Sequence, residues 1–108
     1  MSTISTHILD TALGAPAAGI AVTLFRVDDD LTIGSGISDA DGRVGDLGSG
    51  PVMPGTYRMR FETAAYFAAS ARDAFYPEVN VVFIVGDAAH YHVPLLLNPF
   101  GYSTYRGS

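Results

Sequence analysis

Three histidines, His7, His90 and His92, are the side chains of this sequence that titrate near neutral pH, since it contains no cysteine. On a β-strand, His90 and His92 share one face, roughly 6.5 to 7 Å apart. This pattern fits an acid–base site or a metal site that His7 or a carboxylate completes. It also fits ordinary strand histidines, and the spacing alone does not decide among the three.

Arginine is a second source of chemistry, because all six cationic side chains are arginine and none is lysine. A guanidinium is a planar fork of donors that suits carbonyl and carboxylate groups. Residues 38–43 predict a tight loop around Asp41-Gly42, which would project Arg43 from a rigid turn. Arg43 could then bind a ligand or pair with the neighbouring aspartates, and the sequence favours neither.

Other catalytic patterns are missing from the sequence. The run Asp28-Asp29-Asp30 lacks the ligand spacing of a calcium loop and predicts a solvated turn. The chain contains no Gly-x-Ser-x-Gly elbow, phosphate-binding glycine loop, zinc-protease helix or paired-cysteine motif. The usual nucleophile, phosphate and thiolate chemistries are therefore not indicated.

Length and charge restrict the function further. The 108 residues predict a single domain, 1–108, and the net charge of −5 argues against a nucleic-acid partner. No secretory signal and no apolar run of about 20 residues is visible, so we expect no membrane association and a cytoplasmic location. The lack of cysteine fits a reducing compartment.

Hydrophobic patterning predicts the elements that position these side chains. Strands are expected at 3–9, 20–27, 31–38, 55–62 and 79–85, the second of them central and covered on both faces. Residues 45–55 predict a loop, and residues 63–70 predict one short helix with Thr63 as its N-cap. Residues 90–108 read as strand, turn and strand, joined to the preceding strand by a hairpin at 86–89.

Alternation within these strands predicts which side chains face the core. Ile4, Thr6 and Ile8 share one face of the first strand, so His7 leaves the opposite face. In the terminal stretch His90, His92, Pro94 and Leu96 share a face, and the proline indicates an edge or an interface. Short strands with turns every 8 to 12 residues are typical of an all-β sandwich.

Several segments resemble the transthyretin-related 5-hydroxyisourate hydrolases of purine breakdown. They are residues 5–10 (STHILD), 41–43 (DGR), 75–79 (FYPEV), 90–97 (HYHVPLLL) and the ending 105–108 (YRGS). The resemblance implies a transthyretin-like sandwich of two four-stranded sheets with one short helix. It also implies a homotetramer, a dimer of dimers with active sites in the channel between dimers.

The activity that the resemblance implies is hydrolysis of 5-hydroxyisourate to 2-oxo-4-hydroxy-4-carboxy-5-ureidoimidazoline, with no metal or other cofactor. The implied catalytic residues are His7, Arg43, His92 and Ser108. The implied substrate-binding residues, besides His7 and Arg43, are Tyr105, Arg106 and Gly107. His90 falls outside this set.

The roles that we expect follow from the chemistry of opening a cyclic amide, which needs a base, oxyanion donors and a proton for the leaving nitrogen. His7 and His92 would activate water and shuttle the proton, while Arg43 would hold the substrate carbonyls and stabilise the oxyanion. Tyr105 would position the flat ring, and the hydroxyl of Ser108 or the terminal carboxylate would orient an imidazole.

Three alternatives remain at this point. The first is a transthyretin-like carrier that binds a small ligand without reacting with it. The second is a metal-dependent enzyme that uses His7, His90 and His92. The third is a purely structural sandwich.

Overall fold

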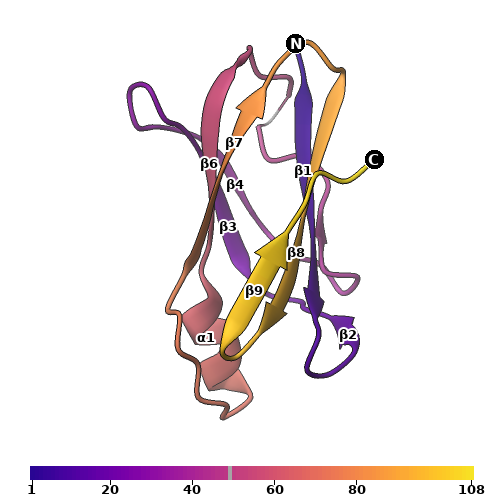
Figure 1. Cartoon of the computed structure of the whole chain (residues 1–108), viewed down its shortest axis with the longest axis vertical. Coiled ribbons are helices and arrows are strands. Elements are labelled where there is room, and N and C mark those ends of the chain that lie inside the picture. Colours follow the sequence, from indigo (N-terminus) through magenta and orange to yellow (C-terminus); the bar gives the residue numbers. More distant parts are fainter. Residues whose placement is uncertain (49) are drawn as a thin grey trace.

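The computed structural model describes residues 1–48 and 50–108, which form two β-sheets packed face to face with a short helix at one end (Figure 1). The elements in chain order are β1 Thr3–Asp10, β2 Ala15–Pro16, β3 Ala21–Arg26, β4 Leu31–Ile37, β5 Arg43–Val44, β6 Gly55–Phe61, α1 Thr63–Ala69, β7 Val79–Val85, β8 His90–Asn98 and β9 Gly101–Thr104. No helix in these two ranges is long and apolar enough to cross a membrane. The predicted all-β sandwich is confirmed.

The two sheets differ in strand direction. The first has the order β2-β1-β8-β9 with β5 also beside β1, and the second has the order β4-β3-β6-β7. Neighbouring strands are antiparallel except β1 and β8, which run parallel from the pair Thr3 and His90 to the pair Asp10 and Leu97. The first sheet therefore has one short strand, β5, more than the four that were expected. Its central pairing joins the two ends of the chain (Figure 1).

The core lies between the sheets and follows the predicted alternation. Tyr57, Met59 and Phe61 of β6 are buried, as are Ile4 and Ile8 of β1. In β8 the odd-numbered residues from Tyr91 to Leu97 point into the core, whereas His90 is exposed and His92 is half-buried. Burial of the apolar faces fixes the register of each strand, because a slip by one residue would turn its apolar side chains outward. The histidines of β8 are thus held on the outer face of the first sheet.

The prediction for β3 is only partly confirmed. The strand is central in its sheet, and Val22 and Leu24 are fully buried. Among the described residues no element forms a second layer over its other face; instead the guanidinium groups of Arg58 and Arg60 lie 4.5 and 4.9 Å from the ring centroid of Phe25. Long arginine side chains from β6 thus cover the aromatic ring that the sequence placed against another element.

The predicted hairpin at residues 86–89 is wrong. β7 pairs with β6 in the second sheet, whereas β8 pairs with β1 and β9 in the first, so this short connection crosses between the sheets. The hydroxyl of Tyr91 accepts hydrogen bonds from the amides of Gly86 and Ala88, at 2.8 and 3.3 Å. A buried side chain therefore supports the crossover where a hairpin would use ladder bonds.

The helix begins where it was predicted, but Thr63 is not its N-cap. Glu62 holds the N-cap position without a side-chain capping bond, and Thr63 is the first helical residue. Thr63 is fully buried, and its hydroxyl donates to the carbonyl of Tyr76 at 3.3 Å. The hydroxyl thus links the helix to the segment before β7.

The predicted loop at 45–55 includes Val52, which forms an isolated β-bridge with Ser2, and it ends where β6 begins. Ser49 lies outside the described residues.

Pro94 does not mark an edge strand, since β8 pairs on both sides. It lies one residue beyond the last backbone pair of β8 with β9, which joins Leu95 to Thr104. The carbonyl of Pro94 accepts a hydrogen bond from the Thr104 hydroxyl at 2.7 Å. At Pro94 the backbone pairing of β8 with β9 has ended, and the Thr104 side chain provides the hydrogen bond instead. A strand tolerates the loss of one amide donor at such a position.

Candidate active site

The register of three strands gathers the candidate side chains on the outer face of the first sheet. His7 in β1 lies opposite Arg43 in β5 and opposite Pro94 in β8, and Ser5 lies opposite His92. Residues that are directly opposite on paired strands point to the same face. His7, Arg43 and His92 therefore emerge on one surface from three neighbouring strands.

His92 is half-buried and held by two hydrogen bonds. Its Nδ1 lies 2.8 Å from the hydroxyl of Ser5, and its backbone carbonyl accepts a hydrogen bond from the amide of Gly107 at 2.9 Å. Burial, followed by the positive charge of Arg43 and the charges of His7 and His90, lowers the pKa of His92 below its ordinary value. The imidazole is therefore neutral near pH 7 and able to accept a proton.

Arg43 leaves the predicted turn, which is rigid. Oδ1 of Asp39 accepts the amides of Asp41 and Arg43, at 2.9 and 3.0 Å. Gly42 has a φ of +77°, and a β-carbon there would lie 2.3 Å from the carbonyl oxygen of Ile8, so only glycine fits. These backbone hydrogen bonds, with the amide of Arg43 first, lower the pKa of Asp39.

The guanidinium of Arg43 makes none of the ion pairs found among residues 1–48 and 50–108. Those pairs involve Arg26, Arg58, Arg60 and Arg72. Of the two alternatives for Arg43, an ion pair with the neighbouring aspartates is thus not seen, although its backbone is bound to Asp39. An exposed guanidinium at the mouth of a pocket can bind the oxygens of a ligand.

A pocket of about 290 Å³ lies between these side chains and is open to solvent. This volume is near the lower end for small-molecule sites and fits one small heterocycle. Most of the residues that line it have polar side chains, and they come from both ends of the chain and from the segment around β5. The lining residues are Ser5, Thr6, Arg43, Val44, Gly45, His90, His92 and Ser108.

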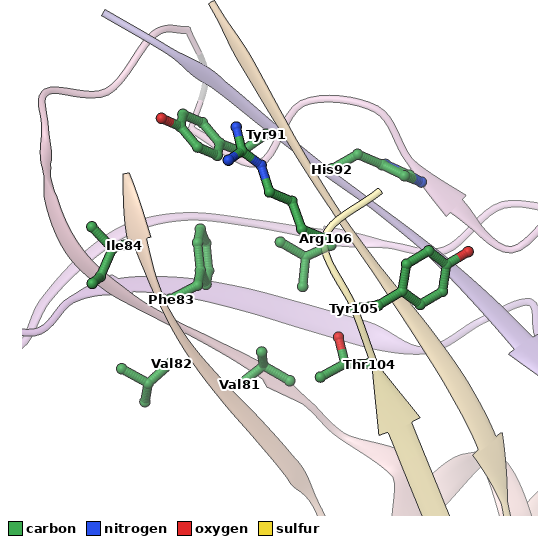
Figure 2. Close-up of a pocket in the computed structure, with 10 residues that line it drawn as sticks. Val81, Val82, Phe83, Ile84, Tyr91, His92, Thr104, Tyr105 and Arg106 are labelled. Carbon is green, nitrogen blue, oxygen red and sulfur yellow. The ribbon is translucent and has the colours of Figure 1, made fainter. Parts of the chain in front are cut away.

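The residues after β9 divide between this pocket and a neighbouring one. Ser108 lines the polar pocket, whereas Tyr105 and Arg106 line a second pocket of about 280 Å³ beside β7. Figure 2 shows Arg106 directed toward Tyr91 and away from His92, and its guanidinium carbon lies 4.8 Å from the centroid of the Tyr91 ring. The ring of Tyr105 points to the same side as His92 in this view (Figure 2) and is 58% exposed.

Of the predicted site residues, the structure therefore brings Arg43, His92 and Ser108 into one pocket. His7 lies beside Arg43 on the same face, and Gly107 packs against His92. Tyr105 and Arg106 do not line the pocket that contains Arg43. In a single chain the predicted set is thus divided between two adjoining pockets.

Sequence reasoning missed Ser5, whose hydroxyl lies 2.8 Å from both Nε2 of His90 and Nδ1 of His92. Strand alternation placed Ser5 on the same face as His7, which was a usable signal. What the sequence did not provide was the parallel pairing of β1 with β8, which sets Ser5 opposite His92.

The histidines do not converge as metal ligands. Within the part of the chain that the structure describes, no group of three or more histidine, cysteine, aspartate or glutamate side chains is arranged to hold a metal ion. His90 and His92 both direct a ring nitrogen at Ser5 instead. The grouping of His7, His90 and His92 that a metal-dependent enzyme would need is therefore not formed.

Comparison with known proteins extends these observations over nearly the whole chain. Residues 4–107 match the HIUase/Transthyretin family. A probable 5-hydroxyisourate hydrolase of Caenorhabditis elegans is 46% identical over 111 residues, which cover 99% of this chain and 82% of the relative.

Two solved structures are similar in fold. The 5-hydroxyisourate hydrolase of Klebsiella pneumoniae has a TM-score of 0.93 and 40% identity, with 100% of both chains covered. Sea bream transthyretin, solved in complex with thyroxine, has a TM-score of 0.85 and 31% identity over 97% of this chain and 94% of that one. The fold therefore occurs both in a 5-hydroxyisourate hydrolase and in a transthyretin solved with thyroxine.

Proposed function

The chain belongs to the HIUase/transthyretin family, and from that premise we propose that it is the enzyme that hydrolyses 5-hydroxyisourate to 2-oxo-4-hydroxy-4-carboxy-5-ureidoimidazoline in urate breakdown. The observation that carries this proposal is the polar pocket in which Arg43 and a neutral His92 lie together. A small, oxygen-rich heterocycle matches both its volume and its donors.

Hydrolysis of the ring amide begins at water. His92 accepts a proton from water while the oxygen attacks the carbonyl carbon, and negative charge develops on the carbonyl oxygen. The guanidinium of Arg43 stabilises that oxyanion. The carbon–nitrogen bond then breaks, and the proton held by the imidazolium passes to the leaving nitrogen, so the histidine is restored.

The remaining predicted residues take supporting roles in this proposal. His7, which pairs with Arg43 across β1 and β5, lies near enough for its charge to lower the pKa of His92, and it assists proton transfer. Ser108 lines the pocket and orients an imidazole of the site, and Gly107 lets the chain approach His92 closely. Tyr105 and Arg106 bind the substrate ring.

Assembly is part of the same proposal. We expect the homotetramer, a dimer of dimers, that membership of the family implies; a pocket that is open on the outer face of a sheet, with Tyr105 and Arg106 outside it, fits such an assembly. A second copy over this face would close the pocket and bring further side chains to the substrate. The expected compartment is the cytoplasm, which suits a chain without cysteine.

The alternative function is transport of a small ligand without reaction, as the sea bream structure with thyroxine suggests for that protein. An arginine and two histidines around the pocket favour catalysis, because an imidazole can accept a proton from water and a guanidinium can stabilise an oxyanion. The two functions differ in one simple measurement. Freshly generated 5-hydroxyisourate should lose its ultraviolet absorbance faster with the protein than by spontaneous decay, whereas an unchanged rate would refute the hydrolase.

A further inference from the structure

Four side chains form a continuous hydrogen-bonded chain along the parallel pairing of β1 and β8. The hydroxyl of Thr3 contacts Nδ1 of His90, and Nε2 of His90 lies 2.8 Å from the hydroxyl of Ser5. The same hydroxyl lies 2.8 Å from Nδ1 of His92. Ser5, which is only 8% exposed, thus joins His90, the histidine without an assigned role, to His92.

The number of protons allows only two arrangements of these hydrogen bonds. A serine hydroxyl carries one proton, so Ser5 can donate to only one imidazole and must accept from the other. In the first arrangement Ser5 donates to His92, which then carries its proton on Nε2. In the second Ser5 donates to His90, and His92 carries its proton on Nδ1 and leaves Nε2 unprotonated.

The charge of Arg43 favours the second arrangement. Arg43 lines the same pocket as His92, and its positive charge lowers the pKa of that imidazole. Near this cation, the His92 ring is more stable when the nitrogen toward the pocket carries a lone pair than when it carries a proton. Nε2 of His92 has no hydrogen-bond partner among residues 1–48 and 50–108, whereas Nδ1 is committed to Ser5. His90 then donates from Nδ1 to the hydroxyl of Thr3, and each of the three hydrogen bonds has one donor and one acceptor.

On the basis of the proposed function, we infer that His90 is a positioning residue that acts through Ser5 and holds His92 in the tautomer with an unprotonated Nε2 facing the substrate. When Nε2 takes a proton from water, the Nδ1–H of His92 remains bound to Ser5. The hydrogen-bonded side chains therefore stabilise the imidazolium without rearranging, which is the benefit of preorganised donors and acceptors. His90 does not exchange a proton with the substrate itself.

A measurement that needs no substrate tests the tautomer. Imidazole ¹⁵N shifts of the labelled protein should show His92 protonated at Nδ1 and bare at Nε2. Ser5→Ala and His90→Ala should both give a mixture of tautomers, and His90→Gln should restore the single form because its amide oxygen can accept from Ser5. A wild-type His92 protonated at Nε2, or a tautomer unchanged by His90→Ala, would overturn the inference.

Kinetics test the consequence. Ser5→Ala and His90→Ala should each lower kcat about tenfold with little change in KM, a smaller loss than removal of an acid–base group. The double variant should be no slower than either single variant, because His90 acts only through Ser5. Ser103→Ala, an exposed serine on the same face at β9, is the matched control and should keep the wild-type kcat.

The outcomes separate this inference from the proposed function. Losses that multiply in the double variant, or a His90→Ala protein with normal kcat, would refute the positioning role while wild-type turnover leaves the hydrolase standing. A wild-type protein that does not accelerate the reaction would refute the hydrolase, and the ¹⁵N measurement would still decide the tautomer.

Discussion

Gly107 packs directly against His92. Its amide donates to the His92 carbonyl at 2.9 Å, and a β-carbon at position 107 would lie 2.6 Å from Cδ2 of the imidazole and 3.3 Å from its Cβ. Only a residue without a side chain allows this approach. The glycine of the terminal YRGS segment is therefore a steric requirement of the imidazole that we place at the centre of the chemistry.

Replacement of Gly107 with alanine should displace the His92 ring and lower kcat, by about tenfold or more because misplacement of a catalytic group by 1 Å can cost a hundredfold. Thermal unfolding should change little, since the segment lies at the periphery. The matched control is Gly101→Ala in β9, where an added methyl meets no atom closer than 3.8 Å. Equal kinetics for the two variants would contradict the steric role of Gly107.

Arg43 is expected to act through its fork of donors as well as its charge. Arg43→Ala should lower kcat/KM by about a hundredfold or more, as loss of an oxyanion donor does. Arg43→Lys should recover only part of this loss because an ammonium cannot make the bidentate contact. The control is Arg58→Ala, which removes an arginine of β6 in the other sheet that pairs with Asp30. This variant should leave the kinetics unchanged.

The pH profile should reflect the lowered pKa of His92. Burial and then the charge of Arg43 disfavour the imidazolium, so the neutral base persists below the ordinary histidine pKa of about 6.5. The acid limb of kcat/KM should therefore fall with a midpoint below that value. In an NMR titration, Arg43→Met should raise the pKa of His92, because the positive neighbour is removed; a lower or unchanged pKa would contradict this account.

Asp10, the last residue of β1, connects this strand to Tyr66 of the helix and to Arg72 in the segment after the helix. It is fully buried, and burial alone would raise its pKa, but hydrogen bonds from Arg72, Tyr66 and the amide of Leu13 outweigh burial and lower the pKa. Asp10→Asn should destabilise the fold by about 3 kcal/mol because Arg72 loses its buried partner. Urea unfolding should detect this loss, while Asp29→Asn, in an exposed ion pair, should unfold almost as the wild type does.

The same carboxylate predicts sensitivity to acid. Because the pKa of Asp10 is lower in the folded chain than in the unfolded chain, its contribution to stability is present above its ordinary value of 3.8. That contribution is lost as the pH falls through the folded pKa. The stability difference between wild type and Asp10→Asn should therefore shrink in acid, and a constant difference would show that the ion pair is not its source.

Much of the fold followed from strand periodicity, since burial enforces a period of two. Tyr57, Met59 and Phe61 were placed inward and Arg58 and Arg60 outward by this rule alone, and the structure agrees. The connection at 86–89 was wrong because a short turn has the same composition whether it joins strands of one sheet or crosses between two. That distinction depends on long-range pairing, which local sequence does not encode.

The residues of the candidate site were predicted from alternation together with family resemblance. Alternation placed His7 on the face opposite the isoleucines of its strand and His92 on one face with His90, and the Asp41-Gly42 turn projected Arg43; the structure puts His7, Arg43 and His92 on one surface. The role of Ser5 as a bridge was invisible because β1 and β8 meet only through parallel pairing of distant segments. The direction of Arg106, over Tyr91, was equally hidden, since it depends on how the chain leaves β9.

The most direct test of the central claim compares wild type with His92→Ala in the hydrolysis of freshly generated 5-hydroxyisourate, with spontaneous decay subtracted. Both proteins should show the same thermal unfolding midpoint within a few degrees, because His92 is only half-buried and lies outside the core. The account predicts that kcat/KM falls at least about a hundredfold, the usual contribution of one acid–base group. Near-normal turnover by His92→Ala would contradict the assignment of His92 as the base.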